Sequence, residues 1–152
     1  MLAGAVRVGS TLTPMERLHH VPAGACTGGT AQTAGMSRFA ALSGDLVGSR
    51  ALFMGRTHVA PGATSGPHHH GHSETGIYVV SGTPAFLYRD EDGRDVRIET
   101  LPGDFVYVPP HVPHIESNEH SDEEAVVVIA RTTQEAIVVN LESLAGAGSA
   151  TA

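Results

Sequence analysis

The sequence predicts an all-β fold, a barrel or a sandwich, and three observations support this. From about Met36 onward the chain consists of short runs rich in β-branched and aromatic residues. Clusters of Gly, Pro and Asp separate these runs, as turn residues separate strands. No stretch keeps the 3.6-residue apolar period of a helix packed on a core. We therefore expect strands to build the core and helices to lie only at its periphery.

Seven runs are expected to form strands. In chain order they are "SRFAAL" (37–42), "RALFMGRTHVA" (50–60), "GIYVV" (76–80), "AFLYRD" (85–90), "DVRIET" (95–100), "DFVYVP" (104–109) and "EAVVVIAR" (124–131). The fourth and fifth runs flank Asp92-Gly93, a dipeptide typical of a tight hairpin. "SGTP" (81–84) and "LPGD" (101–104) predict two further turns. Single helical turns are expected in "PMERLHH" (14–20) and "NLESL" (140–144).

The length of 152 residues suits one domain. Residues 1–35 are predicted to form an irregular arm, extended or in contact with a partner, because "AGACTGGTAQTAG" (23–35) consists almost wholly of residues too small to build a core. Residues 36–143 are expected to form the β-barrel domain. Residues 144–152 are predicted to be a disordered tail, because "AGAGSATA" offers nothing to offset the entropy cost of ordering.

Composition argues against several classes of partner. The formal net charge is −7 and only 16% of the residues are charged, which disfavours a grip on nucleic-acid phosphates or on an anionic membrane. Cys26 is the single cysteine and has no predicted activating group, so we expect neither a disulfide nor a reactive thiol. No run of 18 apolar residues and no secretory signal pattern is present, which favours a soluble cytoplasmic protein with a small-molecule partner.

Four histidines and a glutamate lie within "HHHGHSE" (68–74). On an extended strand side chains alternate between faces, so His68 and His70 point the same way and His69 the other way. This placement suits two ligands of one metal ion, although a histidine-rich surface loop is the alternative. Some forty residues downstream, Pro109 and Pro113 stiffen a turn that delivers His114 onto a new strand. Histidines from both segments that converge in a barrel would make a metal site.

The two segments resemble the two motifs of the cupin superfamily, in particular those of small bacterial single-domain metal-binding cupins. The first motif is matched by Gly62, His68, His70, Glu74 and Gly82, and the second by Gly103, Pro109, His114 and Asn118. The motifs span residues 62–118, and flanking strands extend the likeness over about 45–131. The resemblance implies a single cupin β-barrel of the double-stranded β-helix, or jelly-roll, type. It also implies that His68, His70, Glu74 and His114 hold one divalent transition metal.

The spacing around Glu74 departs from the cupin pattern. Gly82 lies one residue further along than the pattern places it, so strict strand alternation would aim Thr75 into the barrel instead. A bulge at Thr75-Gly76 would restore Glu74, and we favour this because glycine suits a bulge. If no bulge is present, the site is all-histidine and His72 is the substitute ligand.

Other polar residues near the motifs are weaker candidates for a catalytic or binding role. Glu116 follows His114 by two residues and is expected to face inward, where it could transfer protons as a catalytic residue or orient a ligand histidine. His111 is expected in an exposed turn. Arg56 and His58 could bind an anionic group, but a surface position is at least as consistent with their place on a strand.

Three imidazoles and one carboxylate suit Fe, Mn, Co, Ni, Cu or Zn better than Ca or Mg, which prefer oxygen donors. Six-coordinate geometry leaves two positions open, and the local charge of about +1 should attract anionic oxygen chelators such as enolates, catecholates or 2-oxo acids. The first function hypothesis is a dioxygenase. The second is a Lewis-acid isomerase or lyase that acts through an enolate. The third is a small-molecule-binding cupin that does no chemistry.

A small barrel leaves strand edges that need cover. The arm, or the late run "EAIVVN" (135–140), could cross to a neighbouring subunit. We therefore expect a homodimer, which the cupin resemblance also implies.

Overall fold

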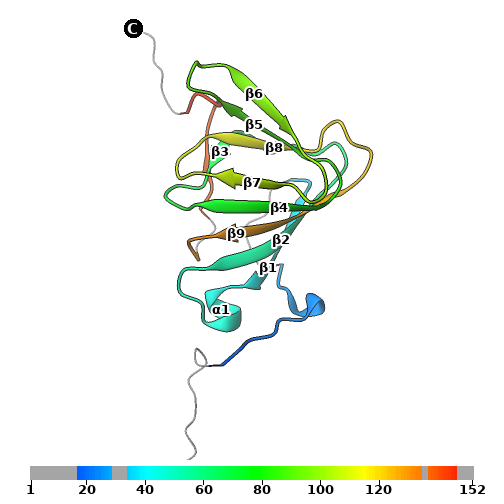
Figure 1. Ribbon diagram of the computed structural model, residues 1–152, viewed down its shortest axis with the longest axis vertical. Coiled ribbons are helices and arrows are strands. Elements are labelled where there is room, and N and C mark those ends of the chain that lie inside the picture. Colours follow the sequence, from blue (N-terminus) through cyan, green and yellow to red (C-terminus); the bar gives the residue numbers. More distant parts are fainter. Residues whose placement is uncertain (1–16, 29–33, 135–136, 147–152) are drawn as a thin grey trace, which may run out of the picture.

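The computed structural model describes residues 17–28, 34–134 and 137–146, which form two five-stranded antiparallel sheets that face each other (Figure 1). The first sheet has the order β1 (Met36–Leu42), β2 (Phe53–Val59), β9 (Ala125–Arg131), β4 (Thr75–Ser81) and β7 (Phe105–Val108). The second sheet has the order β10 (Val139–Asn140), β3 (His68–His69), β8 (His114–Ser117), β5 (Ala85–Arg89) and β6 (Asp95–Glu99). The predicted all-β jelly-roll architecture is confirmed.

Each of the seven predicted runs contains or overlaps a strand, as expected for runs rich in β-branched and aromatic residues. Three described strands lie outside these runs: β3, β8 and β10. β8 is the new strand that was expected to carry His114, and β10 falls within the late run at 135–140. The Asp92-Gly93 hairpin is confirmed between β5 and β6. There Gly93 has a positive φ of 77°, and Asp90 Oδ1 accepts hydrogen bonds from the backbone N–H groups of Asp92 and Arg94.

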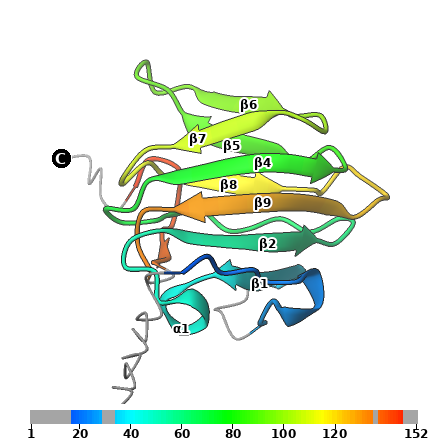
Figure 2. The same ribbon diagram turned by 60° about the horizontal axis from the view of Figure 1, so that its bottom comes forward.

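Helices are short and lie at the edge of the molecule. The described helices are η2 (Ala23–Ala25) and α1 (Gly44–Val47), which Ser43 caps by accepting a hydrogen bond from the N–H of Leu46. The turns expected at 14–20 and 140–144 are not helical in their described parts, 17–20 and 140–144. The hairpin β5–β6 and helix α1 lie at opposite ends of the molecule (Figures 1 and 2). No helix among the described residues is long and apolar enough to cross a membrane.

The segments that were expected to reach a second subunit pair with their own chain where they are described. Thr27, in the predicted arm, exchanges two backbone hydrogen bonds with Ala40 of β1. Strand β10 pairs with β3, so that Val139 lies opposite His69. Residues 1–16, 29–33 and 147–152, which include most of the predicted arm and tail, lie outside the described residues.

The apolar core lies between the sheets and is supplied mostly by the first one. Its buried members are Ala40, Phe53, Ile77, Val79, Phe86, Val108, Val127 and Ile129. Burying a large apolar side chain of this kind contributes about 1.5–3 kcal/mol. Strands β3 and β8 of the second sheet bring histidines into the same interior. Apolar side chains, mostly from the first sheet, therefore line one side of the interior, and the histidines of the second sheet line the other.

Candidate metal centre

Three histidines meet inside the barrel. His68 lies in β3 and His114 in β8, and the two residues are direct partners across these strands. His70 follows β3 immediately. All three are buried, and their ring centroids lie 4.4–5.0 Å apart. With Glu116, each residue offers a ligand atom within 4.8 Å of the others. The predicted convergence of two distant histidine segments is therefore present in the structure.

The histidine rings are oriented by the backbone. Each Nδ1 lies within hydrogen-bond distance of a carbonyl oxygen: His68 with Gly66 (2.9 Å), His70 with Ile137 (3.1 Å) and His114 with Val112 (3.0 Å). Because a carbonyl only accepts, Nδ1 carries the proton in a neutral ring and Nε2 keeps its lone pair. The Nε2 atoms of His70 and His114 are buried and have no hydrogen-bond partner among the described residues. A metal ion would satisfy both Nε2 atoms. In metal sites, a ligand histidine typically donates its other ring N–H to a carbonyl oxygen, as these histidines do here.

Burial keeps two of the histidines neutral. It lowers the pKa of His70 to about 3, and the positive charge of Arg131 acts in the same direction. The pKa of His68 is lowered as well, again chiefly by burial. Protons therefore compete little with a metal for these nitrogens near neutral pH.

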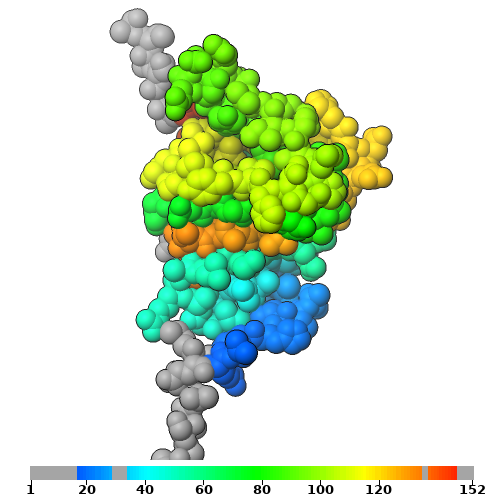
Figure 3. All heavy atoms as spheres, viewed as in Figure 1, coloured from blue at the N-terminus to red at the C-terminus, as the bar shows by residue number. Residues whose placement is uncertain are grey.

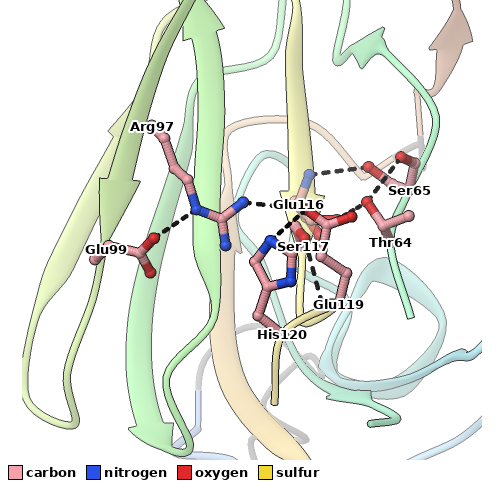
Figure 4. Close-up of polar contacts among 8 residues, drawn as sticks. All are labelled: Thr64, Ser65, Arg97, Glu99, Glu116, Ser117, Glu119 and His120. Carbon is pink, nitrogen blue, oxygen red and sulfur yellow. Dashed lines mark hydrogen bonds and ion pairs between the residues drawn. The ribbon is translucent and has the colours of Figure 1, made fainter. Parts of the chain in front are cut away.

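Glu116 supplies the carboxylate of the cluster. Strand alternation places it on the same side of β8 as His114, and its Oε1 lies 3.8 Å from Nε2 of that residue. Burial opposes ionisation, but the neighbouring histidines, His114 first, outweigh it and hold the pKa of the Glu116 carboxyl below its usual range. The backbone of Glu116 is fixed by Ser65, whose Oγ accepts its N–H at 2.9 Å, and by the hydroxyl of Thr64 (Figure 4).

Glu74 departs from the expectation that it completes the ligand set. It is exposed, and its carboxylate accepts a hydrogen bond of 2.7 Å from the hydroxyl of Tyr107 outside the barrel. Thr75 is buried in its place and has the inward position. The sequence alternative without a bulge at Thr75-Gly76 is therefore the one that the structure follows.

The physical reason is the position of the β-bulge that accommodates the extra residue of strand β4. Pairing of β4 with β9 is regular from Thr75 to Val79, and the register shifts between Val79 and Ser81. The bulge therefore lies near the Gly82 end of the strand, after the site. Alternation from Val79 back to Thr75 is undisturbed, so Glu74 points outward.

The structure does not bring the other candidates to the cluster. His72, the substitute ligand, is exposed. His111 is exposed in a turn with a φ of 61°, as expected, and its ring lies 5.6 Å from that of His69. On the outer side of β2, His58 pairs with Glu124 at 3.0 Å, and Arg56 is half-buried.

Two buried arginines were missed by the sequence interpretation. Arg38 of β1 and Arg131 of β9 are 6% and 3% exposed, and both charges act on the histidine cluster. Burial, and next the charge of Arg38, lower the pKa of Arg131 to about 10, which leaves it positive near neutral pH. The sequence contained an indication of this position. Each arginine lies an even number of residues from inward apolar residues of its strand, so alternation places it on the inner face.

A cavity of about 680 Å³ reaches the centre from one side. It opens between the hairpin β5–β6 and strand β7 on the side of the molecule that Figure 3 shows. Its lining is largely apolar and aromatic and includes Phe86, Tyr88, Val106, Val108, Val112 and His114. The volume lies within the range of sites for small ligands. A much smaller opening, about 30 Å³, touches His68 and Glu116 from another side and suits about one water molecule.

Comparisons with known proteins agree with this architecture. The family model described as "Cupin domain" matches residues 55–130, half of the chain. No curated protein matches the sequence. Among solved structures, a single-residue mutant of Bacillus subtilis oxalate decarboxylase is 23% identical with a TM-score of 0.63, and covers 74% of this chain and 29% of its own. The same enzyme at pH 4.6 is 24% identical with a TM-score of 0.63, at 72% and 28% coverage.

These likenesses concern the fold. The chain spans less than a third of the oxalate decarboxylase chains it matches. Another of those structures, 23% identical with a TM-score of 0.63 and covering 74% of this chain and 29% of its own, is described by its Mn(II) centres. The barrel that surrounds the histidine cluster thus has the shape of a barrel found in a manganese protein.

Proposed function

The chain belongs to the cupin family, and from this premise we propose that it is a metal-dependent enzyme acting on a small anionic organic substrate. The observation that carries the proposal is the convergence of the buried His68, His70 and His114 with the half-buried Glu116, whose ligand atoms lie within 4.8 Å of one another. We assign these four residues as the ligands of one divalent transition metal. Glu116 thereby takes the place that the cupin resemblance gave to Glu74.

The donor set supports a transition metal. Three neutral imidazoles and one carboxylate suit Mn, Fe, Co, Ni, Cu or Zn, whereas Mg and Ca prefer a shell of oxygens. When bound, such a metal supplies Lewis acidity and, as Fe or Mn, a redox centre for chemistry with dioxygen. If the three histidines alone hold the metal, Glu116 is instead placed to transfer a proton beside it.

Dioxygenation is the reaction that we propose. A six-coordinate metal held by four protein ligands would have two positions left, one for a substrate oxygen and one for dioxygen. The protein's part is to hold the ligands, to orient the substrate along the apolar cavity and to keep water from the reacting atoms. Because His114 lines this cavity, a substrate bound in it would lie against the histidine cluster.

Decarboxylation is a second candidate, and a specific observation favours it. The solved structures that resemble this barrel include several of oxalate decarboxylase. A Lewis-acid centre beside buried positive charge could also bind a small carboxylic acid and stabilise the charge that develops when CO₂ leaves.

The test uses protein loaded in turn with Fe(II), Mn(II) and Zn(II) and a panel of enolizable, catecholic and small dicarboxylic acids. A dioxygenase consumes O₂ in proportion to substrate, whereas a decarboxylase releases CO₂ without net O₂ uptake. His114→Ala, which removes one ligand, should abolish either activity. Arg97→Gln, at an exposed ion pair with Glu99, is the control and should retain it. Turnover that persists in His114→Ala would contradict the proposal.

A further inference from the structure

Buried positive charge faces the histidine cluster from the first sheet. Arg131 and Arg38 both lie at inward positions of their strands and are almost fully buried. Glu116 is the carboxylate whose charge acts on Arg131, and no Asp or Glu is among the buried residues of the described ranges. The Arg131 guanidinium already places one buried positive charge beside the histidines. A divalent metal would add to that charge, and a buried site tolerates the sum best with an anion nearby.

Hydrogen-bond donors point to where that anion binds. Nε and Nη1 of Arg131 are buried and have no partner among the described residues, and the same holds for Oγ1 of Thr75. Thr75 and Arg131 are direct partners across β4 and β9, on the inner face of the first sheet. A buried donor without a partner is costly, so a ligand that accepts from all three atoms would relieve the cost.

We propose that Arg131 and Thr75 form a subsite for one carboxylate of the substrate, beside the metal centre. The planar guanidinium can donate two parallel hydrogen bonds to a carboxylate through Nε and a terminal nitrogen. The Thr75 hydroxyl donates a third, and Arg38 adds charge. The inference rests on the proposed function, because the metal centre holds the remainder of the same substrate.

The subsite lies in the same layer as the wall of the large cavity. Val108, which lines that cavity, pairs with Thr75 across β7 and β4, and Thr75 in turn pairs with Arg131. A row of three inward side chains thus leads from the cavity to the arginine. His114 lines the cavity on the opposite sheet.

This arrangement defines a substrate class. The substrate is a small organic acid with one carboxylate for Arg131 and a second oxygen function for the metal. Its apolar part lies along the side of the cavity formed by Phe86, Val106 and Val112. The proposal excludes neutral substrates and cations.

The subsite can be tested without the metal. The full-length protein is treated with a chelator, and binding of acetate and of malonate is measured by calorimetry and by the thermal midpoint, with sodium chloride at equal ionic strength as the reference. Both carboxylates should bind to the metal-free protein. Arg131→Met should weaken binding by roughly tenfold to a hundredfold, as loss of a charge-assisted hydrogen bond implies. Thr75→Val, a milder change of similar shape, should weaken it several-fold.

Arg50→Met is the control, because it removes the same charge from an exposed position before strand β2. It should bind acetate as the wild type does. A purely structural role for Arg131 predicts the opposite pattern: Arg131→Met would lower the midpoint of the metal-free protein and leave the affinity of folded protein for acetate unchanged. That pattern, or a wild-type protein that responds to acetate no more than to chloride, would overturn the subsite.

Reloading the metal separates this inference from the proposed function. With metal bound, malonate should bind more tightly than acetate, because its second carboxylate reaches the metal. Acetate binding that depends on Arg131, with no gain for malonate, would support the subsite and count against the metal centre. A gain for malonate that Arg131→Met leaves intact would support the metal centre and contradict the subsite.

Discussion

At the residue scale, the site depends on which carboxylate faces the barrel. Glu116 lies beside the three histidines, whereas Glu74 is bound to Tyr107 at the surface. Glu116→Gln should therefore weaken metal affinity by at least roughly tenfold. Glu74→Gln should leave it unchanged and serves as the isosteric control. Competition against a chromophoric chelator measures both. A greater loss of affinity in the Glu74 variant would restore the ligand set that the cupin motif implies.

The buried histidines also set a pH dependence of stability. In the unfolded chain His70 takes up a proton as pH falls through about 6.5, whereas burial holds its folded pKa at about 3. Between these values the unfolded state binds more protons, so the free energy of unfolding falls as pH falls. For metal-free protein we expect a loss of up to about 1.4 kcal/mol per pH unit for each such group. Urea unfolding with a chelator between about pH 7 and pH 5 measures it.

His70→Gln provides the comparison for that measurement. The variant cannot titrate in this window, so its stability should fall less steeply with decreasing pH than that of the wild type. Saturating metal should raise the stability of the wild type but leave this slope unchanged, because the folded-state nitrogen carries no proton in this window with or without the metal. Equal slopes in wild type and variant would contradict a neutral, buried His70.

Sequence reasoning placed the histidines but not all of their surroundings. His68 and His70 follow from strand alternation, His114 from its turn and the cupin motif, and the inward side of Glu116 from its distance to His114. The expectation that Glu74 faces the barrel was not met, because side-chain alternation assigns residues to faces only relative to a bulge. A single sequence does not show where along the strand the bulge lies. The arginines were missed because a charged residue in phase with apolar neighbours was taken as part of a strand and not as a site residue.

At the element scale, the turn after β4 is the feature that keeps this strand in register. Gly82 follows the bulge with a φ of 77°, and a Cβ added there would lie 2.7 Å from the Cα of Ala125. Gly93 has the same φ in the β5–β6 hairpin, but a Cβ there would meet no atom within 4 Å. The two glycines therefore share a backbone conformation and differ in their surroundings.

Substitution by alanine should lower the free energy of unfolding by different amounts at these two positions. Gly93→Ala adds the left-handed strain alone, about 1–2 kcal/mol. Gly82→Ala adds the collision with the β9 backbone and should cost more than that, about 3 kcal/mol or above. Chemical denaturation of both variants checks the difference. If the two costs are equal, the close packing of Gly82 against β9 does not matter to stability.

The strands of the first sheet could be predicted because each is a run of four or more residues rich in β-branched, aromatic or other apolar side chains. Strands β3 and β10 have only two residues each, so no period can be counted. They form because neighbouring backbones offer hydrogen-bond partners, as β8 and β10 do for β3. Helix α1 was likewise too short for any periodic signal, although Ser43 and Gly48 bracket it as a cap and a left-handed end.

At the scale of the whole molecule, the outer face of the first sheet leaves aromatic side chains exposed. The rings of Tyr78 of β4 and Phe105 of β7 contact each other at an interplanar angle of 49°, with centroids 4.8 Å apart, and Phe105 is 80% exposed. Tyr107 is also exposed. A group of exposed aromatic residues on a flat sheet is typical of a subunit contact.

We predict that the protein is a homodimer through this face. Light scattering should give about twice the 15.8 kDa mass of one chain. Phe105→Arg should shift the equilibrium toward the monomer by placing a charge in an apolar contact. Leu52→Arg, at an exposed position before β2, is the control and should stay dimeric. A wild-type mass of one chain would refute the dimer.

The central claim is that two distant segments of the chain hold one transition metal between the sheets. The direct measurement is the metal content per chain of protein purified without added metal, for wild type and for His114→Ala. We expect close to one equivalent of a transition metal in the wild type and most of it lost in the variant, while its far-UV circular dichroism remains that of a β-barrel. A folded His114→Ala protein that keeps a full equivalent, or a wild type that binds no transition metal when it is supplied, would contradict the account.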